Sequence, residues 1–232
     1  MRTTMMGILA LGLLTGGAQA DDRALRDALA RRLAEGIRVE VTDGVVTLEG
    51  TARSVWDKRD AIERATETDG VAAVEDKIEI AHGESDEQVA EEIAKAVRRY
   101  VFFTIYDDVS VAIDEGNVSL TGRVTMPFKS DEIEERVSKV MGVQSVTNEI
   151  TTLPTNIGDQ KLRAALAYRI YRDPLFRDLA SRVNPPIHIV VERGRVALTG
   201  AVRSEVEKRK AEHIARSTFG VFGVDNRLVV GS

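Results

Sequence analysis

The chain has 232 residues, a formal net charge of −5 and no cysteine. Without cysteine it can form no disulfide, zinc–thiolate site, cysteine nucleophile or lipidated N-terminal cysteine. This length fits one large domain or several small ones.

The N-terminal residues have the pattern of a secretory signal peptide. A basic start at Arg2 is followed by the apolar residues 5–14 and the small residues that end at Ala20. This order is typical of a peptide cleaved after Ala20, and the apolar stretch is too short to span a bilayer as a helix. The sequence therefore predicts a signal peptide over residues 1–20. The mature protein is expected to be periplasmic, not a lipoprotein, and without a transmembrane segment; a buried N-terminal helix is the alternative.

Three segments of the remaining chain share one pattern of glycines and alternating apolar residues. Each has two alternating runs around a turn that ends in glycine, which is typical of a β-hairpin. In each copy the turn glycine is followed by a second glycine six residues later and a third after another twenty. These turn and repeat glycines are Gly44, Gly50 and Gly70, then Gly116, Gly122 and Gly142, then Gly194, Gly200 and Gly220. The shared register indicates an internal repeat.

Each copy is expected to begin with a helix before the hairpin. Apolar residues recur there at every fourth position, which places them on one helix face. The rows are Leu25, Leu29 and Leu33 in the first copy, Val89, Ile93 and Val97 in the second, and Leu162, Leu166 and Ile170 in the third. The predicted N-caps are Asp21 or Asp22, Ser85 or Asp86, and Asp159.

A second helix and a third strand are expected after each hairpin. The helices are predicted over 55–68, 129–140 and 204–218, and the third glycine of each copy ends them. The third strands are predicted over 77–80, 149–153 and 227–230. Two helices on one face of a three-stranded sheet give an α+β fold of three tandem αββαβ domains. We refer to these domains as repeat one (21–82), repeat two (83–155) and repeat three (156–232).

The repeated motifs resemble a known bacterial module. The segments DGVVTLEG, EGNVSLTG and RGRVALTG, with the later DGVAAV, MGVQSV and FGVFGVDNRLVV, are similar to the BON domain of the OsmY and nodulation family, also called the transport-associated domain. The resemblance implies an αββαβ sandwich in a periplasmic or outer-envelope protein, with a link to osmotic or envelope stress. It also implies binding to phospholipid surfaces or other envelope components without catalysis.

Charge is distributed unevenly among the repeats. Residues 21–82 carry 10 basic and 15 acidic side chains, residues 83–156 carry 7 and 14, and residues 157–232 carry 14 and 8. Two acidic repeats are thus followed by one with a net charge of +6. The basic repeat is expected either to meet an anionic partner or to dock on its acidic neighbours.

Aromatic residues gather in longer connections between the first helix and the hairpin of repeats two and three. They are Tyr100, Phe102, Phe103 and Tyr106 in repeat two, and Tyr171 and Phe176 in repeat three. These side chains are expected either to fill the seams between repeats or to form a membrane-contact edge with nearby arginines. The arginines are Arg98, Arg99, Arg169, Arg172 and Arg177.

Candidate contacts with anionic phospholipid lie in the basic repeat. They are Arg172, Phe176, Arg177, Arg203, Lys208, Arg209 and Lys210. Each basic residue near an anionic leaflet contributes about 1 kcal/mol. A solvated helix face without a ligand is the alternative for the run from Lys208 to Lys210.

No motif predicts catalysis or a cofactor. His82, His188 and His213 have no second ligand at metal-binding spacing, and His188 is expected to face solvent. The adjacent pair Asp107 and Asp108 lacks the spacing of a calcium loop, so turn chemistry is expected there. The sequence predicts no enzyme activity, no cofactor, no metal site and no nucleic-acid partner.

These observations lead to one hypothesis and one alternative. The chain is expected to be a non-catalytic periplasmic protein that binds anionic phospholipid or envelope surfaces peripherally and supports tolerance of envelope or osmotic stress. The alternative is a structural adaptor that binds envelope proteins or peptidoglycan, with its hairpin edges as docking strands.

Overall fold

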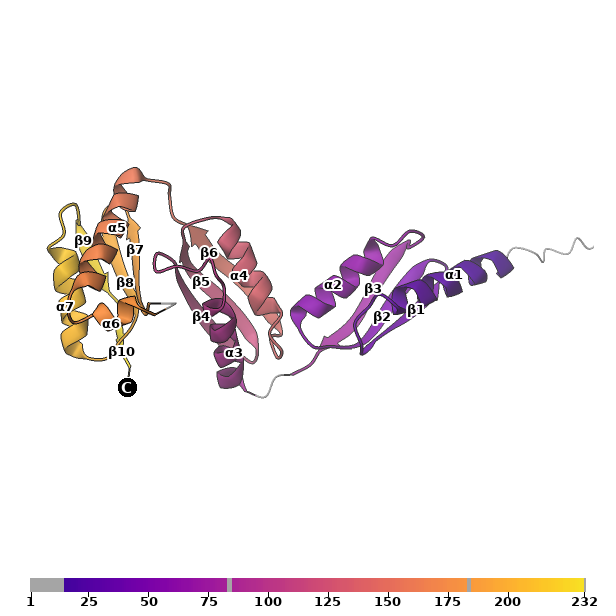
Figure 1. Cartoon of the computed structure of the whole chain (residues 1–232). Coiled ribbons are helices and arrows are strands. Elements are labelled where there is room, and N and C mark those ends of the chain that lie inside the picture. The colour runs from indigo at the N-terminus through magenta and orange to yellow at the C-terminus, as the bar shows by residue number, and fades with distance from the viewer. Residues whose placement is uncertain (1–14, 83–84, 183–184, 232) are drawn as a thin grey trace, which may run out of the picture. The chain divides into compact units, whose positions relative to one another are not determined.

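The computed structural model describes residues 15–82, 85–182 and 185–231, with side chains from Asp21 onward (Figure 1). Contacts divide the chain into two units, Met1–Ala81 and His82–Ser232. The first unit contains repeat one except for His82, and the second contains His82 with repeats two and three. None of the described helices is long and apolar enough to cross a membrane.

Repeat one has the predicted α-β-β-α-β order. It contains α1 (Thr15–Ala30), β1 (Ile37–Thr42), β2 (Val45–Ala52), α2 (Val55–Thr66) and β3 (Ala73–Ile80). The central strand β2 pairs antiparallel with β1 and parallel with β3. β3 begins before the predicted strand 77–80 because it pairs with β2 along its full length. α1 continues across the predicted cleavage position after Ala20, while residues 1–14 of the predicted signal peptide lie outside the described residues.

Repeat two has the same topology. It contains α3 (Asp86–Arg98), β4 (Asp108–Asp114), β5 (Asn117–Val124), α4 (Phe128–Ser138) and β6 (Ser145–Thr152). The strand order is β4-β5-β6, with β5 antiparallel to β4 and parallel to β6. The predicted apolar row of the first helix is buried, since Val89, Ile93 and Val97 all lie in the core.

Repeat three adds a short helix and an interrupted third strand to this plan. It contains α5 (Ile157–Arg172), α6 (Arg177–Ala180), β7 (Ile187–Glu192), β8 (Arg195–Val202), α7 (Glu205–Arg216), β9 (Gly223–Asn226) and β10 (Val229–Val230). Both β9 and β10 pair in parallel with β8 in a single register. The third strand therefore begins before the predicted range 227–230 and is broken at Arg227 and Leu228. The three tandem α+β repeats predicted from the sequence are confirmed.

Each hairpin turn is held by an aspartate of the preceding helix. In repeat three the Asp159 carboxylate accepts the backbone N–H groups of Arg193 (2.8 Å) and Gly194 (2.9 Å). Asp22 and Asp86 make the same two bonds to the turns of repeats one and two. Both turn residues have positive φ in all three copies, a conformation that glycine adopts without strain.

These bonds correct part of the N-cap prediction. Ser85 caps α3 as predicted, because its hydroxyl accepts the backbone N–H of Gln88. The cap of α5 is Asn156 rather than Asp159, and Asp22 lies inside α1 rather than at its start. The carboxylates of Asp22 and Asp159 bind the hairpin turns instead.

The glycine that closes each hairpin is required by a close backbone contact. A Cβ atom on Gly200 would lie 1.9 Å from the carbonyl oxygen of Pro186, and one on Gly122 would lie 2.1 Å from that of Asp108. All nine repeat glycines have positive φ. The repeat pattern thus reflects positive φ at every repeat glycine and, at the glycine that closes each hairpin, a lack of room for a side chain.

The two sheets of the second unit lie between helices. Figure 1 shows both sheets with α4 on one side and α5 with α7 on the other. The helix-free faces of the two sheets look toward each other. Residues of β4 and β5 contact residues of β7 and β8 across this space, and these contacts form the seam between repeats two and three.

Candidate functional site

The aromatic connection of repeat two builds this seam. The ring of Phe103 lies 5.4 Å from the ring of His188 in β7, and the carbonyl of Ile105 accepts the backbone N–H of Ile189 at 2.6 Å. Tyr100 is only 1% exposed and carries the Arg136 guanidinium over its ring. For Tyr100 and Phe103 the structure favours packing and seam formation over the membrane-edge alternative, whereas Phe102 is 54% exposed.

Asp107 anchors the same connection from within repeat two. Its fully buried carboxylate receives the Lys129 ammonium at 2.7 Å and four N–H and O–H bonds from Thr104 and Thr125. Burial acts to raise the pKa of Asp107, but the bonds from Lys129, Thr125 and Thr104 outweigh it and hold the pKa below its usual value. The carboxylate thus organises turns, and within the described residues no group of three His, Asp or Glu side chains could hold a metal.

The prediction that His188 faces solvent is wrong. Its side chain is half-buried at the seam rather than facing solvent, because repeat two covers this face of β7. Its Nδ1 lies 2.7 Å from the carbonyl oxygen of Asp107, so this nitrogen carries the hydrogen and donates it. Beside it, the Thr199 hydroxyl donates to the carboxylate of Asp108 at 2.8 Å.

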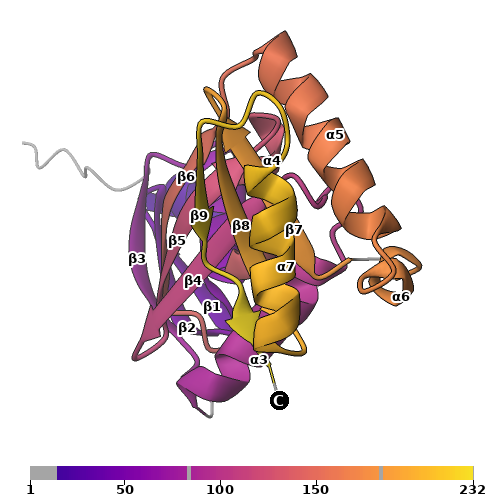
Figure 2. The same ribbon diagram turned by 90° about the vertical axis from the view of Figure 1, so that its left-hand side faces the viewer.

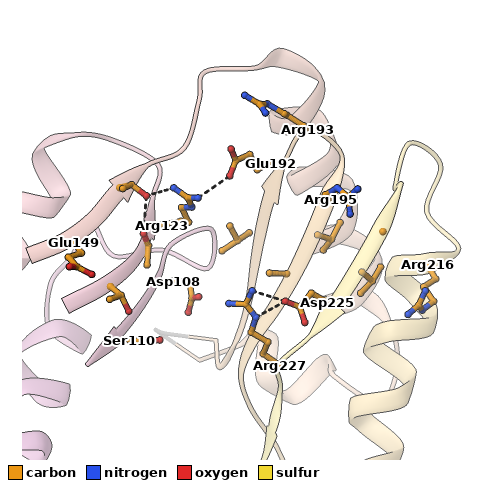
Figure 3. A pocket seen from close by; sticks show the side chains of 18 residues that line it. Asp108, Ser110, Arg123, Glu149, Glu192, Arg193, Arg195, Arg216, Asp225 and Arg227 are labelled. Carbon is orange, nitrogen blue, oxygen red and sulfur yellow. Dashed lines mark hydrogen bonds and ion pairs between the residues drawn. The ribbon is translucent and has the colours of Figure 1, made fainter. Parts of the chain in front are cut away.

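A cleft of about 1010 Å³ opens next to the seam, between the helix-free faces of the two sheets (Figure 3). Its charged lining consists of Arg123, Arg193, Arg195, Arg216 and Arg227 with Asp108, Glu149, Glu192 and Asp225. Two pairs neutralise charge inside it: Arg123 with Glu192 at 3.6 Å, and Arg227 with Asp225 at 2.6 Å. The arginines are concentrated at the repeat-three side of the cleft.

Two of these arginines keep their charge uncompensated. Among the described residues, Arg193 and Arg195 have no ion-pair partner. Arg193 lies in the β7–β8 turn and Arg195 begins β8, and both are exposed. Arg216, at the end of α7, pairs with Glu212 at 2.8 Å but stays 60% exposed. Positive charge therefore accumulates at the turn end of repeat three.

The phospholipid contacts predicted from the sequence lie on the helical side of repeat three, away from these turn-end arginines. Lys208, Arg209 and Lys210 belong to α7, and the ion pair Lys210–Asp173 (3.3 Å) joins this run to the end of α5. Arg203 bridges to Asp178 of α6 and to Glu207 of α7. The guanidinium of Arg172 lies over the ring of Tyr168. Of these predicted cations, Arg203 and Lys210 are linked by ion pairs to α6 and to the end of α5, respectively.

Phe176 does not belong to that surface. It is 0% exposed and packs in the core of repeat three with Leu179 of α6. The Tyr171 hydroxyl also points inward and donates to the carbonyl of Ile187 at 2.6 Å. The short helix α6, which the sequence analysis did not predict, follows Phe176 directly and adds Leu179 to the same core. Arg177 remains exposed at the start of α6.

The structure reveals exposed aromatic residues that the sequence analysis did not single out. Phe219 is fully exposed and Phe222 is 82% exposed, both in the connection between α7 and β9. We define the repeat-three tip as Arg193, Arg195, Arg216, Phe219 and Phe222. An available signal was the repeat itself, because the matching positions of repeats one and two carry neither phenylalanine nor arginine.

Comparisons with known proteins agree with the repeat pattern. The family model of the BON domain matches residues 21–82, 85–154 and 159–232. Osmotically-inducible protein Y of Escherichia coli (strain K12) is 31% identical over 123 residues, which are 52% of this chain and 61% of that protein. The match therefore spans less than two thirds of that relative.

Two solved structures of CdsD, a structural protein of the type III secretion system of Chlamydia trachomatis, align with most of the chain. They share 16% and 15% identity with it, cover 91% and 90% of it and 92% and 96% of their own lengths, and give TM-scores of 0.26. These scores are too low to indicate a shared arrangement of the whole chain.

Proposed function

The chain belongs to the BON-domain family, with three BON domains in tandem, and from this membership we propose that it is a non-catalytic envelope protein that binds anionic phospholipid surfaces through its third domain. A periplasmic location is supported by the signal-peptide pattern of residues 1–20. A role in osmotic or envelope stress is supported by the relationship to osmotically-inducible protein Y.

The observation that carries this proposal is the charge of repeat three. Residues 157–232 hold 14 basic and 8 acidic side chains, whereas both preceding repeats are acidic. Exposed cations lie both at the tip and along α6 and α7, including Arg177, Arg193 and Arg209. A leaflet that contains anionic lipid attracts each nearby Lys or Arg by about 1 kcal/mol.

The seam between repeats two and three does not account for this charge. The ion pair that crosses it, Arg123–Glu192, takes its cation from the acidic repeat and its anion from the basic one. Other polar links across the seam join His188 and the backbone N–H of Ile189 to backbone carbonyls of repeat two, and Thr199 to Asp108. None of these contacts uses a lysine or arginine side chain of repeat three.

Sedimentation with vesicles tests the proposal. The chain from residue 21 to 232 is mixed with phosphatidylcholine vesicles, with or without phosphatidylglycerol, at low and physiological salt. We expect binding only to the anionic vesicles, and weaker binding as salt rises, because screening shortens the range of surface charge. Absence of binding under every condition would contradict the proposal and favour the protein or peptidoglycan adaptor.

A charge-reversal variant then tests the residues predicted from the sequence. Replacing Lys208, Arg209 and Lys210 by glutamate is expected to weaken anionic binding by about 1 kcal/mol per residue or more. The matched control reverses Arg23, Arg31 and Arg53, three exposed arginines of repeat one. It changes the net charge by the same amount, so a loss of vesicle binding that is confined to the α7 variant assigns the contact to α7. Unchanged binding by the α7 variant excludes that run.

A further inference from the structure

The repeat-three tip presents two bare phenylalanine rings beside a cluster of arginines. Figure 2 shows the α7–β9 connection and the β7–β8 turn at the same end of repeat three. Phe219 and Phe222 lie in the connection, 101% and 82% exposed, and Arg193 and Arg195 flank the turn. Two solvated aromatic rings three residues apart in the chain are costly to keep in water and indicate a contact surface.

The other repeats serve as internal references for this surface. The glycine register assigns each tip residue an equivalent position in every repeat. The equivalents of Arg193, Arg195, Arg216, Phe219 and Phe222 are Asp43, Val45, Thr66, Asp69 and Ala72 in repeat one, and Glu115, Asn117, Ser138, Met141 and Gln144 in repeat two. The formal charge of the five positions is −2, −1 and +3 in repeats one, two and three. The fold therefore accommodates acidic, polar and aliphatic residues here, and only repeat three combines cations with aromatic rings at these positions.

Hydrogen bonds connect the backbone under the tip to neighbouring elements. The backbone N–H of Phe222 donates to the carbonyl of Gly194 at 2.9 Å, and a Cβ on Gly194 would lie 2.6 Å from the Phe222 ring. Arg169 of α5 holds the end of α7 through the carbonyl of Ser217 (2.9 Å) and the hydroxyl of Thr218 (2.7 Å). The rings are thus displayed by a connection whose backbone is already ordered, so little further ordering is needed for them to bind.

We propose that the repeat-three tip is a membrane-insertion element: Phe219 and Phe222 enter the headgroup region of an anionic phospholipid leaflet while the tip arginines meet lipid phosphates. Aromatic rings are favoured at the membrane interface, and guanidinium groups pair with phosphate oxygens in two-bond geometry. This inference rests on the proposed function and gives it a site distinct from the run 208–210. Arg193 and Arg195 are the leading phosphate contacts, because Arg216 already pairs with Glu212.

The first test replaces the two phenylalanines of the tip by the residues at the equivalent positions of repeat one. The double variant Phe219→Asp and Phe222→Ala reproduces Asp69 and Ala72, so the same backbone supports it elsewhere in the chain. Its apparent affinity for vesicles of phosphatidylglycerol in phosphatidylcholine should fall at least about tenfold, since burial of one phenylalanine alone is worth about that factor. Circular dichroism establishes that the variant is folded.

Two controls make the same change of charge at other exposed apolar sites. Met141→Asp alters the position of repeat two that is equivalent to Phe219, and Val101→Asp alters another site of repeat two that is 83% exposed. Both should bind the vesicles within about twofold of the unaltered chain, because an exposed substitution outside the contact has little effect. An equal loss in all three proteins would overturn the assignment to the tip.

The second test reports insertion directly. Trp56 is the only tryptophan, so Phe219→Trp in a Trp56→Phe chain gives a single fluorophore at the tip. We expect a blue shift with anionic vesicles and quenching by lipids brominated in the acyl chain. If the unaltered chain binds anionic vesicles but the tip variants bind equally and this tryptophan stays in water, the tip inference is wrong and the proposed function stands. If the unaltered chain binds no vesicle, both fail.

Discussion

At the scale of single residues, Asp107 shows how a buried charge can organise a connection. Its carboxylate accepts hydrogen bonds from Thr104, which precedes β4 in the chain, and from Thr125 and Lys129, which follow β5. Its neighbour Asp108 points the other way and binds Thr199 of repeat three. The sequence indicated turn chemistry for this pair, and the structure adds that the two carboxylates serve different repeats.

We expect Asp107→Asn to lower the free energy of unfolding of the second unit by about 3–5 kcal/mol at neutral pH, because the substitution leaves the Lys129 ammonium buried without its anion. Denaturant unfolding followed by circular dichroism measures the change. The control is Asp114→Asn, at an exposed position of β4, which should change the same quantity by less than about 0.5 kcal/mol.

Acid should reproduce this loss in the unaltered protein. The pKa of Asp107 is lower in the folded protein than its usual value of 3.8, so its contribution is fully present above about pH 4 and disappears as pH falls through the folded pKa. The stability difference between the unaltered protein and Asp107→Asn should therefore narrow below about pH 4. A difference that stays constant into that range would contradict the assigned role.

At the scale of elements, the same pair of hydrogen bonds connects the first helix to the hairpin turn in every repeat. An aspartate of the first helix accepts two consecutive N–H groups of the turn, with donor–acceptor distances between 2.8 and 3.0 Å in all three copies. Asp159 is 5% exposed, whereas Asp86 is exposed. The same bonds are thus made in environments of different polarity.

We expect the loss of unfolding free energy on removing this aspartate to be larger where its carboxylate is more buried. Asp159→Ala should lower the free energy of unfolding by about 1–3 kcal/mol, because two turn N–H groups lose their acceptor in a site with little water. Asp86→Ala is the matched control: it removes the same two bonds where water can replace the carboxylate, and its cost should be smaller. Urea unfolding of the two variants compares them, and a larger loss for Asp86→Ala would contradict the burial argument.

At the scale of the whole molecule, the seam makes repeats two and three one unit. Phe103 and Ile105 of repeat two contact His188 and Ile189 of repeat three. Small domains of this length bury little apolar surface by themselves. Contact across the seam therefore stabilises both.

Phe103→Asp should uncouple these two repeats. The change places a charge against His188 and removes the apolar contact, so the single cooperative transition expected of the second unit should separate into two. Hydrogen exchange of the amides in β5 and β8 measures whether the sheets open together. Val101→Asp, at a site 83% exposed, is the control and should leave them coupled. Unchanged coupling in Phe103→Asp would show that the seam is not what joins the repeats.

The sequence by itself determined the repeats, their α-β-β-α-β order and the family. These features depend on local regularities: alternation of apolar residues in strands, spacing of four in helices, and glycine where φ is positive. Gly44, Gly116 and Gly194 reveal the hairpins because the turn is decided by the residues that form it. The boundaries of the third strands were less accurate, since strand length is set by pairing with a partner far along the chain.

Only the tertiary structure decided which side chains reach solvent. Phe176 and Phe219 belong to the same repeat, yet one is fully buried and the other fully exposed. Local sequence does not distinguish them, because burial depends on which distant elements cover each position: α6 closes over Phe176, while no described element covers Phe219. For the same reason His188, expected in solvent, lies at the seam. Side-chain environment is a property of the assembled fold, whereas the repeat is a property of the chain.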